Sequence, residues 1–138
     1  MMRFNQAWLL DPENGNIYHG FAVVTAVRGG TPSEVEKLFL LALSKPKVDS
    51  VAFVDYGRFL WTQKQYEKSL MQLNKALERS STARNARSNI SMVYYLKGDF
   101  SNACEWAKAA QKNGDVLESG FLEDMCRRAG KSDARPSP

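Results

Sequence analysis

The sequence predicts an all-α protein built from stacked helical hairpins. It matches itself at a shift of 34 residues, and a period of this size is typical of helical-repeat proteins. The matching residues are small, aliphatic or aromatic, and several lie three or four positions apart, as they would along one face of a helix. The matching pairs are Tyr56 and Ile90, Gly57 and Ser91, Tyr66 and Phe100, Ser69 and Ala103, Leu73 and Ala107, and Ala76 and Ala110.

The period extends into the first third of the chain with one extra residue, since Ala22 and Gly57 are 35 positions apart. The insertion is most simply placed in residues 28–31, whose two glycines tolerate an irregular backbone. Ala22, Gly57 and Ser91 lie at equivalent positions of the repeat. We expect these small residues to let the two helices of each hairpin approach closely.

Capping signals fall where the period requires a helix to begin or end. Residues 31–34, Thr-Pro-Ser-Glu, form a capping box with proline at the first helical position. Gly98 can end one helix in the left-handed conformation, Asp99 can cap the next, and Asp49 can cap the helix after Pro46. No segment has a convincing strand pattern. The predicted helices cover about residues 3–10, 16–28, 32–44, 50–62, 66–79, 83–96, 100–112 and 116–129.

Together these marks resemble the tetratricopeptide repeat. In that family an aromatic, a large apolar and a small residue mark the first helix of a hairpin, and an aromatic followed by small or apolar residues marks the second. The chain departs from this pattern at Pro32 and Arg87, where an aromatic is usual. The resemblance implies a right-handed superhelix in a single domain of residues 1–130. We expect a half repeat at 3–14, repeats at 15–49, 50–83 and 84–114, a capping helix at 115–129, and a disordered tail at 131–138.

The first predicted helix lacks the partner that would complete its hairpin. Its apolar residues Phe4 and Trp8 are then left without their usual cover. Three explanations stay open: the chain begins part-way through a longer protein, the helix pairs with a second copy of itself, or it packs as an end cap. The second explanation makes Phe4 and Trp8 self-association residues of a homodimer.

The compartment depends on what precedes this chain. As written, the sequence has no stretch of roughly 20 apolar residues and no signal peptide, which fits a cytoplasmic protein. However, the N-terminal segment and residues 121–125 are similar to bacterial envelope tetratricopeptide lipoproteins, which carry a lipoprotein signal upstream of a half repeat. That resemblance implies a periplasmic or envelope-tethered protein, which would meet a membrane only through a lipid anchor missing from this chain.

The two cysteines do not settle the compartment. Cys104 and Cys126 fall on predicted helices that should be neighbours, so a disulfide is compatible with the fold but does not follow from the sequence. Two cysteines in helices are more often buried as small apolar residues. They form no CxxC motif and lack the partners of a metal site.

We expect no catalytic activity, no cofactor and no metal. His19 is the single histidine, and the sequence contains no phosphate-binding loop, dinucleotide fingerprint, metalloprotease motif or nucleophile elbow. A mechanism built on His19 would need a positioned nucleophile or carboxylate, which the sequence does not identify.

The resemblance instead places a ligand groove on the concave face, along the first helix of each hairpin. On that stripe Asn85 and Asn89 are expected to hydrogen-bond a peptide backbone, and Arg58 to bind a carboxylate. Simpler explanations exist, since Asp55 and Arg58 suit a surface ion pair and His19 suits a packed position. The expected groove residues are His19, Val23, Asp55, Arg58, Trp61, Asn85, Asn89, Met92 and Tyr95, with Gly20, Val27 and Val51 on the same stripe.

The net charge of +4 and the pI of about 9.1 raise the question of nucleic acid. Helical repeats that read RNA carry base-reading side chains once per repeat, and this stripe does not repeat its chemistry. We therefore expect a protein or peptide partner rather than nucleic acid. The sequence predicts a non-catalytic adaptor that binds a partner segment in the concave groove. The alternative is a self-associating scaffold that assembles through the N-terminal half repeat.

Overall fold

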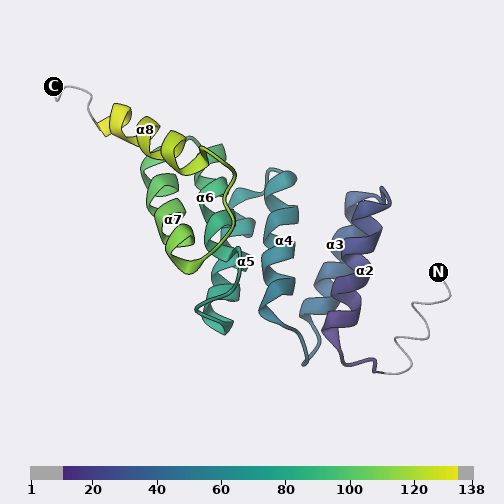
Figure 1. The fold of residues 1–138 in the computed structure, drawn as a ribbon. Helices are drawn as coiled ribbons and strands as arrows, with labels where there is room; N and C mark the ends of the chain where they lie inside the picture. The colour runs from purple at the N-terminus through teal and green to yellow at the C-terminus, as the bar shows by residue number, and fades with distance from the viewer. Residues whose placement is uncertain (1–10, 134–138) are drawn as a thin grey trace.

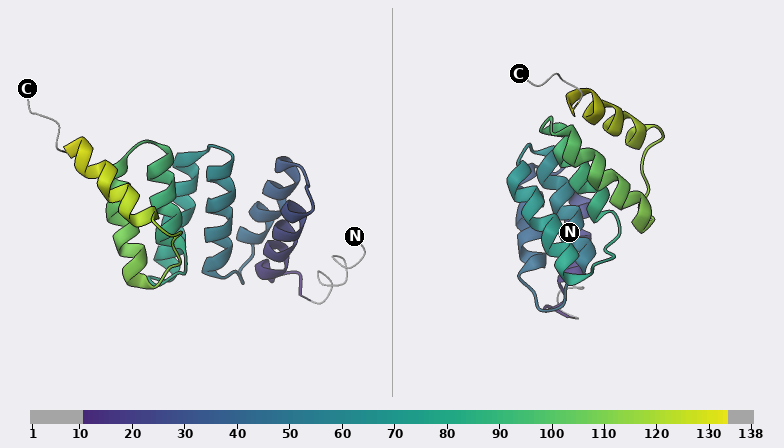
Figure 2. Two further views of the ribbon diagram at one scale, coloured as in Figure 1. Left: turned by 45° about the horizontal axis from the view of Figure 1, so that its top comes forward. Right: turned by 90° about the vertical axis from the view of Figure 1, so that its left-hand side faces the viewer.

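The computed structural model describes residues 11–133. This part of the chain contains helices and one isolated bridge between Asn14 and Lys47, but no strand. Helices α2 to α7 stack side by side along the molecule, and α8 lies at a slant across the end of the stack (Figure 1, Figure 2). The helices are α2 (Gly15–Val27), α3 (Pro32–Leu43), α4 (Ser50–Thr62), α5 (Tyr66–Arg79), α6 (Ala86–Leu96), α7 (Phe100–Asn113) and α8 (Phe121–Asp133).

The helices pair into three hairpins, α2 with α3, α4 with α5, and α6 with α7. The small residues that the period predicts, Ala22, Gly57 and Ser91, are all buried. The approach is closest at Gly57, where an added Cβ would lie only 2.6 Å from Leu73 Cγ. The size of these residues therefore sets how closely the helices of a hairpin pack.

Two clusters of buried side chains join the hairpins to one another. The second and third hairpins share a core that includes Leu73 and Ile90. The first hairpin joins the second through a smaller cluster, in which the rings of Phe39 and Tyr56 stack with centroids 5.2 Å apart. The Tyr56 hydroxyl donates to the Glu36 carboxylate at 2.9 Å. Burial, together with this hydrogen bond, raises the pKa of Tyr56, so the phenol remains a donor across the junction.

Two of the predicted caps are confirmed and one acts differently. Thr31 Oγ1 accepts a hydrogen bond from the Glu34 N–H at 3.2 Å, and Asp99 caps α7 through its side chain. Asp49 precedes α4 but makes no side-chain cap bond. Its carboxylate instead accepts a hydrogen bond from Asn16 Nδ2 at 3.1 Å, which ties α4 to α2.

Helix α6 begins at Ala86, three residues later than predicted, because Asn85 has a left-handed backbone with φ +65°. The buried carboxylate of Asp115 accepts hydrogen bonds from the N–H groups of Asn85 at 3.0 Å and Ser88 at 3.3 Å. A carboxylate at a helix N-terminus satisfies free N–H groups and suits the helix dipole. Asp115 therefore supplies the cap that Asn85 does not.

The capping helix expected at 115–129 is observed as α8, which begins only at Phe121. It starts late because Asp115 is held at the N-terminus of α6 and because Gly120, with φ +80°, departs from the helical path just before Phe121. Residues 131–133 of the expected disordered tail belong to α8, whereas 134–138 lie outside the described residues.

A disulfide between Cys104 and Cys126 joins α7 to α8. The sequence left open whether these cysteines are bridged or simply buried, and the structure contains the bridge. Beside it, Met125 is fully buried and packs with Ala103 and Ala129. In the described part of the chain, every helix is too short or too polar to cross a bilayer.

Candidate functional site

One surface, formed mainly by α2, α4 and α6, carries two open cavities that meet at Arg58. The first, of about 320 Å³, lies between α2 and α4 and is called the apolar cavity. The second, of about 230 Å³, lies between α4, α6 and residues 116–121 and is called the polar cavity. We call the two together the groove. It brings together seven of the residues expected from the sequence: Val23, Asp55, Arg58, Trp61, Asn85, Asn89 and Met92.

The polar cavity is built around a chain of hydrogen bonds. Trp61 Nε1 donates to Asn89 Oδ1 at 2.8 Å, and Asn89 Nδ2 donates to the backbone oxygen of Asn85 at 2.7 Å. The Asn89 amide therefore has one hydrogen and one lone pair left for a ligand. Asn85 Oδ1 is enclosed and has no hydrogen-bond partner. Asn89 therefore presents free hydrogen-bonding groups beside the cavity, whereas the Asn85 side-chain oxygen is enclosed.

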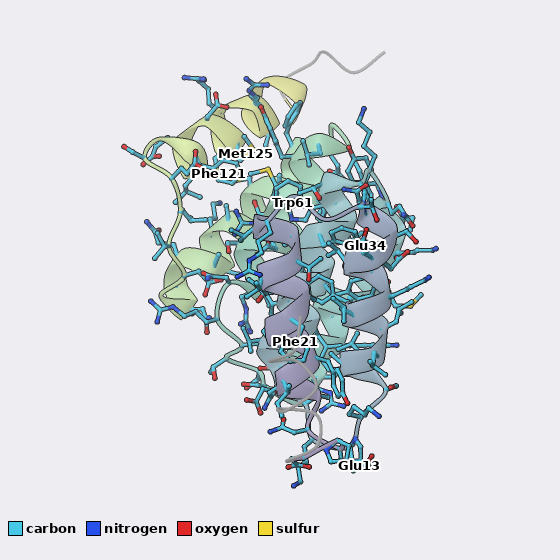
Figure 3. The ribbon with its side chains drawn as sticks, turned by 90° about the vertical axis from the view of Figure 1, so that its right-hand side faces the viewer. Glu13, Phe21, Glu34, Trp61, Phe121 and Met125 are labelled. Carbon is cyan, nitrogen blue, oxygen red and sulfur yellow. A yellow bond between two sulfur atoms is a disulfide. The ribbon has the colours of Figure 1, made fainter. Side chains whose placement is uncertain are left out.

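Residues 116–121 form a wall of the polar cavity that sequence reasoning missed. Val116, Leu117 and Phe121 give this wall apolar surface, and Glu118 adds a carboxylate. Trp61 and Phe121, labelled in Figure 3, come from α4 and α8 and line the same cavity. The signal that could have indicated this wall is Gly114, which ends α7 with φ +86° and lets the chain turn back toward α6.

The apolar cavity is lined by side chains from both helices of the first hairpin and from α4. Val23 and Val27 are exposed at 38% and 83%, and the buried ring of Phe39 also lines it. Phe59 and Arg58 come from α4. Val27 was placed on the predicted stripe, whereas Phe39 and Phe59 were not expected to contribute.

His19 lines neither cavity but fixes the arrangement of the groove. Its Nε2 lies 2.7 Å from Asp55 Oδ2, and its ring lies 6.2 Å from that of Phe39. The simpler explanation of Asp55 and Arg58 as an ion pair is wrong, because Asp55 pairs with His19. Arg58 makes no ion pair with any of residues 11–133, and its guanidinium is exposed between the two cavities.

Tyr95 is the other expected residue that lines neither cavity of the groove. Its ring lies 5.9 Å from Phe100 and 5.9 Å from Phe121, with the Arg128 guanidinium 5.6 Å from its centre. These contacts hold α8 against the third hairpin. The self-association residues Phe4 and Trp8 lie outside the described residues.

Two arrangements that are common in enzyme active sites are not present among residues 11–133. No group of three or more histidine, cysteine or acidic side chains within 11–133 is arranged to hold a metal ion. The His19–Asp55 pair is not extended by a hydrogen bond to a hydroxyl or thiol of this same part of the chain. The groove offers apolar surface, amides, the Glu118 carboxylate and the Arg58 guanidinium, which makes no ion pair with a described residue.

Stacked antiparallel hairpins with small residues at their contacts define a tetratricopeptide-repeat fold, as the sequence predicted. Solved structures agree. PilF of Pseudomonas aeruginosa has 19% identity and a TM-score of 0.81, over 93% of this chain and 59% of that one. PilW, a widely conserved type IV pilus biogenesis factor, has 21% identity and a TM-score of 0.77, over 95% of this chain and 62% of that one.

YrrB, a TPR protein with an unusual peptide-binding site, has 20% identity and a TM-score of 0.72, over 96% of this chain and 67% of that one. This chain therefore spans only about three fifths of the length of PilF and of PilW. No protein-family model matches the sequence, and no curated protein matches it. These likenesses show the fold.

Proposed function

We propose that this protein is a non-catalytic adaptor that captures a peptide, or an extended segment of a partner protein, in the groove. The observation that carries the proposal is that two open cavities lie on one face and share Arg58. Side chains of an extended segment can enter both cavities while its backbone meets the free hydrogen and lone pair of Asn89. The structural neighbour YrrB supports the proposal, because it is a TPR protein that has a peptide-binding site.

Selection from a library of random displayed peptides tests the proposal. We expect wild type to yield binders whose synthetic forms can be titrated by calorimetry. Val23→Arg, which fills the apolar cavity with a charged side chain, should weaken this binding at least about tenfold. Met71→Arg is the matched control, because Met71 is 56% exposed on α5 and lines neither cavity of the groove.

Two results would reject the adaptor proposal. The first is that selection yields no binder. The second is that Val23→Arg and Met71→Arg bind the selected peptides as wild type does. Circular dichroism of both variants must match that of wild type, so that a loss of binding reports on the groove rather than on folding.

A self-associating scaffold is the second candidate, and exposed apolar side chains at the N-terminal end of the stack favour it. Figure 3 looks onto this end and labels Phe21 on α2 and Glu34 on α3. Val24 is one turn from Phe21, and Leu41 is two turns from Glu34, so both share this end face. Each is 39% exposed. Such a face suits a second copy of the chain.

Light scattering coupled to size exclusion tests the scaffold with the intact chain and with Trp8→Glu. A dimer that becomes monomeric in the variant supports assembly through the N-terminal half repeat. A monomer in both cases rejects it and leaves the groove as the candidate site.

A further inference from the structure

The charge of the groove is set by which of its ionisable side chains already have partners. Asp55 already has a partner, since its carboxylate accepts a hydrogen bond from His19 Nε2 at 2.7 Å across α2 and α4. Arg58, one turn further along α4, has no acidic partner among residues 11–133 and lines both cavities. An exposed guanidinium beside an apolar cavity favours a planar carboxylate, which can accept two of its hydrogen bonds.

Next to Arg58, the apolar cavity provides a site for an uncharged side chain. Its lining includes Val23, Ala26 and Val27, and 83% of Val27 is exposed. Covering such surface is favourable by roughly 25 cal/mol per Å² of apolar area. The single acidic group of this cavity is Asp55, which is paired, so an aliphatic side chain meets no unpaired charge there except that of Arg58.

The other acidic group of the groove fixes where the carboxylate can lie. Glu118 is exposed on the wall formed by residues 116–121 and makes no ion pair with a described residue. Like charges repel, so Glu118 disfavours an acidic side chain in its own part of the polar cavity. The carboxylate is therefore restricted to the Arg58 side.

We propose that the ligand of the groove is a short extended segment in which an aliphatic residue, held in the apolar cavity, neighbours a carboxylate held by Arg58. This inference rests on the proposed adaptor function and adds the chemistry of the partner. We assign this carboxylate to an aspartate or glutamate side chain within the segment. A carboxylate at the C-terminus of the partner would present the same group to Arg58, and the test distinguishes the two.

The test uses random peptides displayed with a free C-terminus and, separately, with a blocked one. Selection on the wild-type protein should enrich an aliphatic residue adjacent to an acid in both libraries, because a side chain supplies the carboxylate. Enrichment only in the free-terminus library would overturn this assignment, because the chain end would then supply the carboxylate. Binding should weaken as salt concentration rises, since an exposed ion pair is screened.

Charge reversal at Arg58 gives the decisive comparison. The selected synthetic peptide should bind Arg58→Glu at least about tenfold more weakly than wild type, and Arg58→Gln to an intermediate extent. Replacing the peptide's acid by lysine should restore its affinity for Arg58→Glu. Lys68→Glu is the matched control, because it makes the same change of charge at an exposed position of α5 that lines neither cavity.

The outcomes separate this inference from the adaptor proposal. Peptides that lose binding to Val23→Arg but show no acid enrichment, or that bind Arg58→Glu as well as wild type, overturn the ligand chemistry and leave the adaptor in place. Absence of any binder overturns both. A homodimer that Val23→Arg disrupts assigns the groove to a second copy and also overturns the inference.

Discussion

Two buried serines make the same kind of contact from opposite helices. In the second hairpin Ser69 of α5 donates to the Gly57 oxygen of α4 at 2.6 Å. In the third, Ser91 of α6 donates to the Ala103 oxygen of α7 at 2.7 Å. Gly57 and Ser91 are equivalent in the repeat, as are Ser69 and Ala103. The hydroxyl therefore comes from the second helix of one hairpin and from the first helix of the other. The sequence predicted that these positions are small, but the acceptor of each hydroxyl depends on how the helices pack.

Gly57→Ala should destabilise the protein by about 1–3 kcal/mol, the usual range for overpacking. The new Cβ would lie 2.6 Å from Leu73 Cγ and 2.7 Å from its Cδ2, and Leu73 is fully buried. Urea unfolding followed by circular dichroism measures the change.

Gly20→Ala is the matched control, because a Cβ at Gly20 of α2 meets nothing within 4 Å. It should stabilise the helix by up to about 1 kcal/mol, as alanine does in place of glycine. Equal effects of the two substitutions would show that close packing is not what the glycine at position 57 provides.

Helix starts that depend on neighbouring residues were predicted well. Helices α3 and α7 begin at the predicted residues 32 and 100, where Thr31 and Asp99 cap them. Helices α4 and α5 also have the predicted bounds, although neither has a side-chain cap. The starts of α6 and α8 were placed too early because both depend on Asp115, which is 30 residues from Asn85 in the sequence. A cap supplied across that separation leaves no local pattern.

Asp99→Ala should cost about 1 kcal/mol at neutral pH, the typical value of an N-cap. Hydrogen bonds from the Asn102 side chain and N–H hold the pKa of Asp99 below its ordinary value. Between these two pKa values the unfolded chain binds more protons than the folded one. The contribution of the charged cap is therefore complete above the ordinary pKa and is lost as the pH falls through the lower, folded value.

Unfolding of wild type and Asp99→Ala at neutral and acid pH tests this expectation, and the difference between them should shrink on acidification. Asp99→Asn serves as control, since an amide also caps a helix but does not titrate. A difference between wild type and Asp99→Ala that is the same at both pH values would contradict the role of the charged carboxylate.

At the scale of the whole molecule, the sequence predicted the stack and much of the groove for the same reason. A period of 34 residues repeats the position of each first helix, so residues on one stripe of those helices share a surface. The pairing of His19 with Asp55 and the wall at residues 116–121 break that regularity. Each of the two features arises from contacts at one place in the stack that do not recur in the other repeats. A repeat pattern in the sequence therefore does not predict them.

The junction between the first two hairpins should be the weakest part of the described stack. It is bordered by the apolar cavity and, between α3 and α5, by a further cavity of about 610 Å³. In a stack where each hairpin contacts only its neighbours, such a junction opens before the rest. Hydrogen exchange should therefore be faster in α2 and α3 than in α4 to α7.

Phe39→Ala and Ile90→Ala test this difference, because each removes a buried side chain from a different cluster at a cost of about 2–5 kcal/mol. Phe39→Ala should speed exchange in α2 and α3 and leave α6 and α7 protected, whereas Ile90→Ala should speed exchange in α4 to α7. Equal loss of protection along the chain in both variants would mean that the stack unfolds as one unit. Since the apolar cavity lies at the weak junction, a peptide bound there should slow exchange in α2 and α3 more than in α6 and α7, because it holds the first two hairpins together.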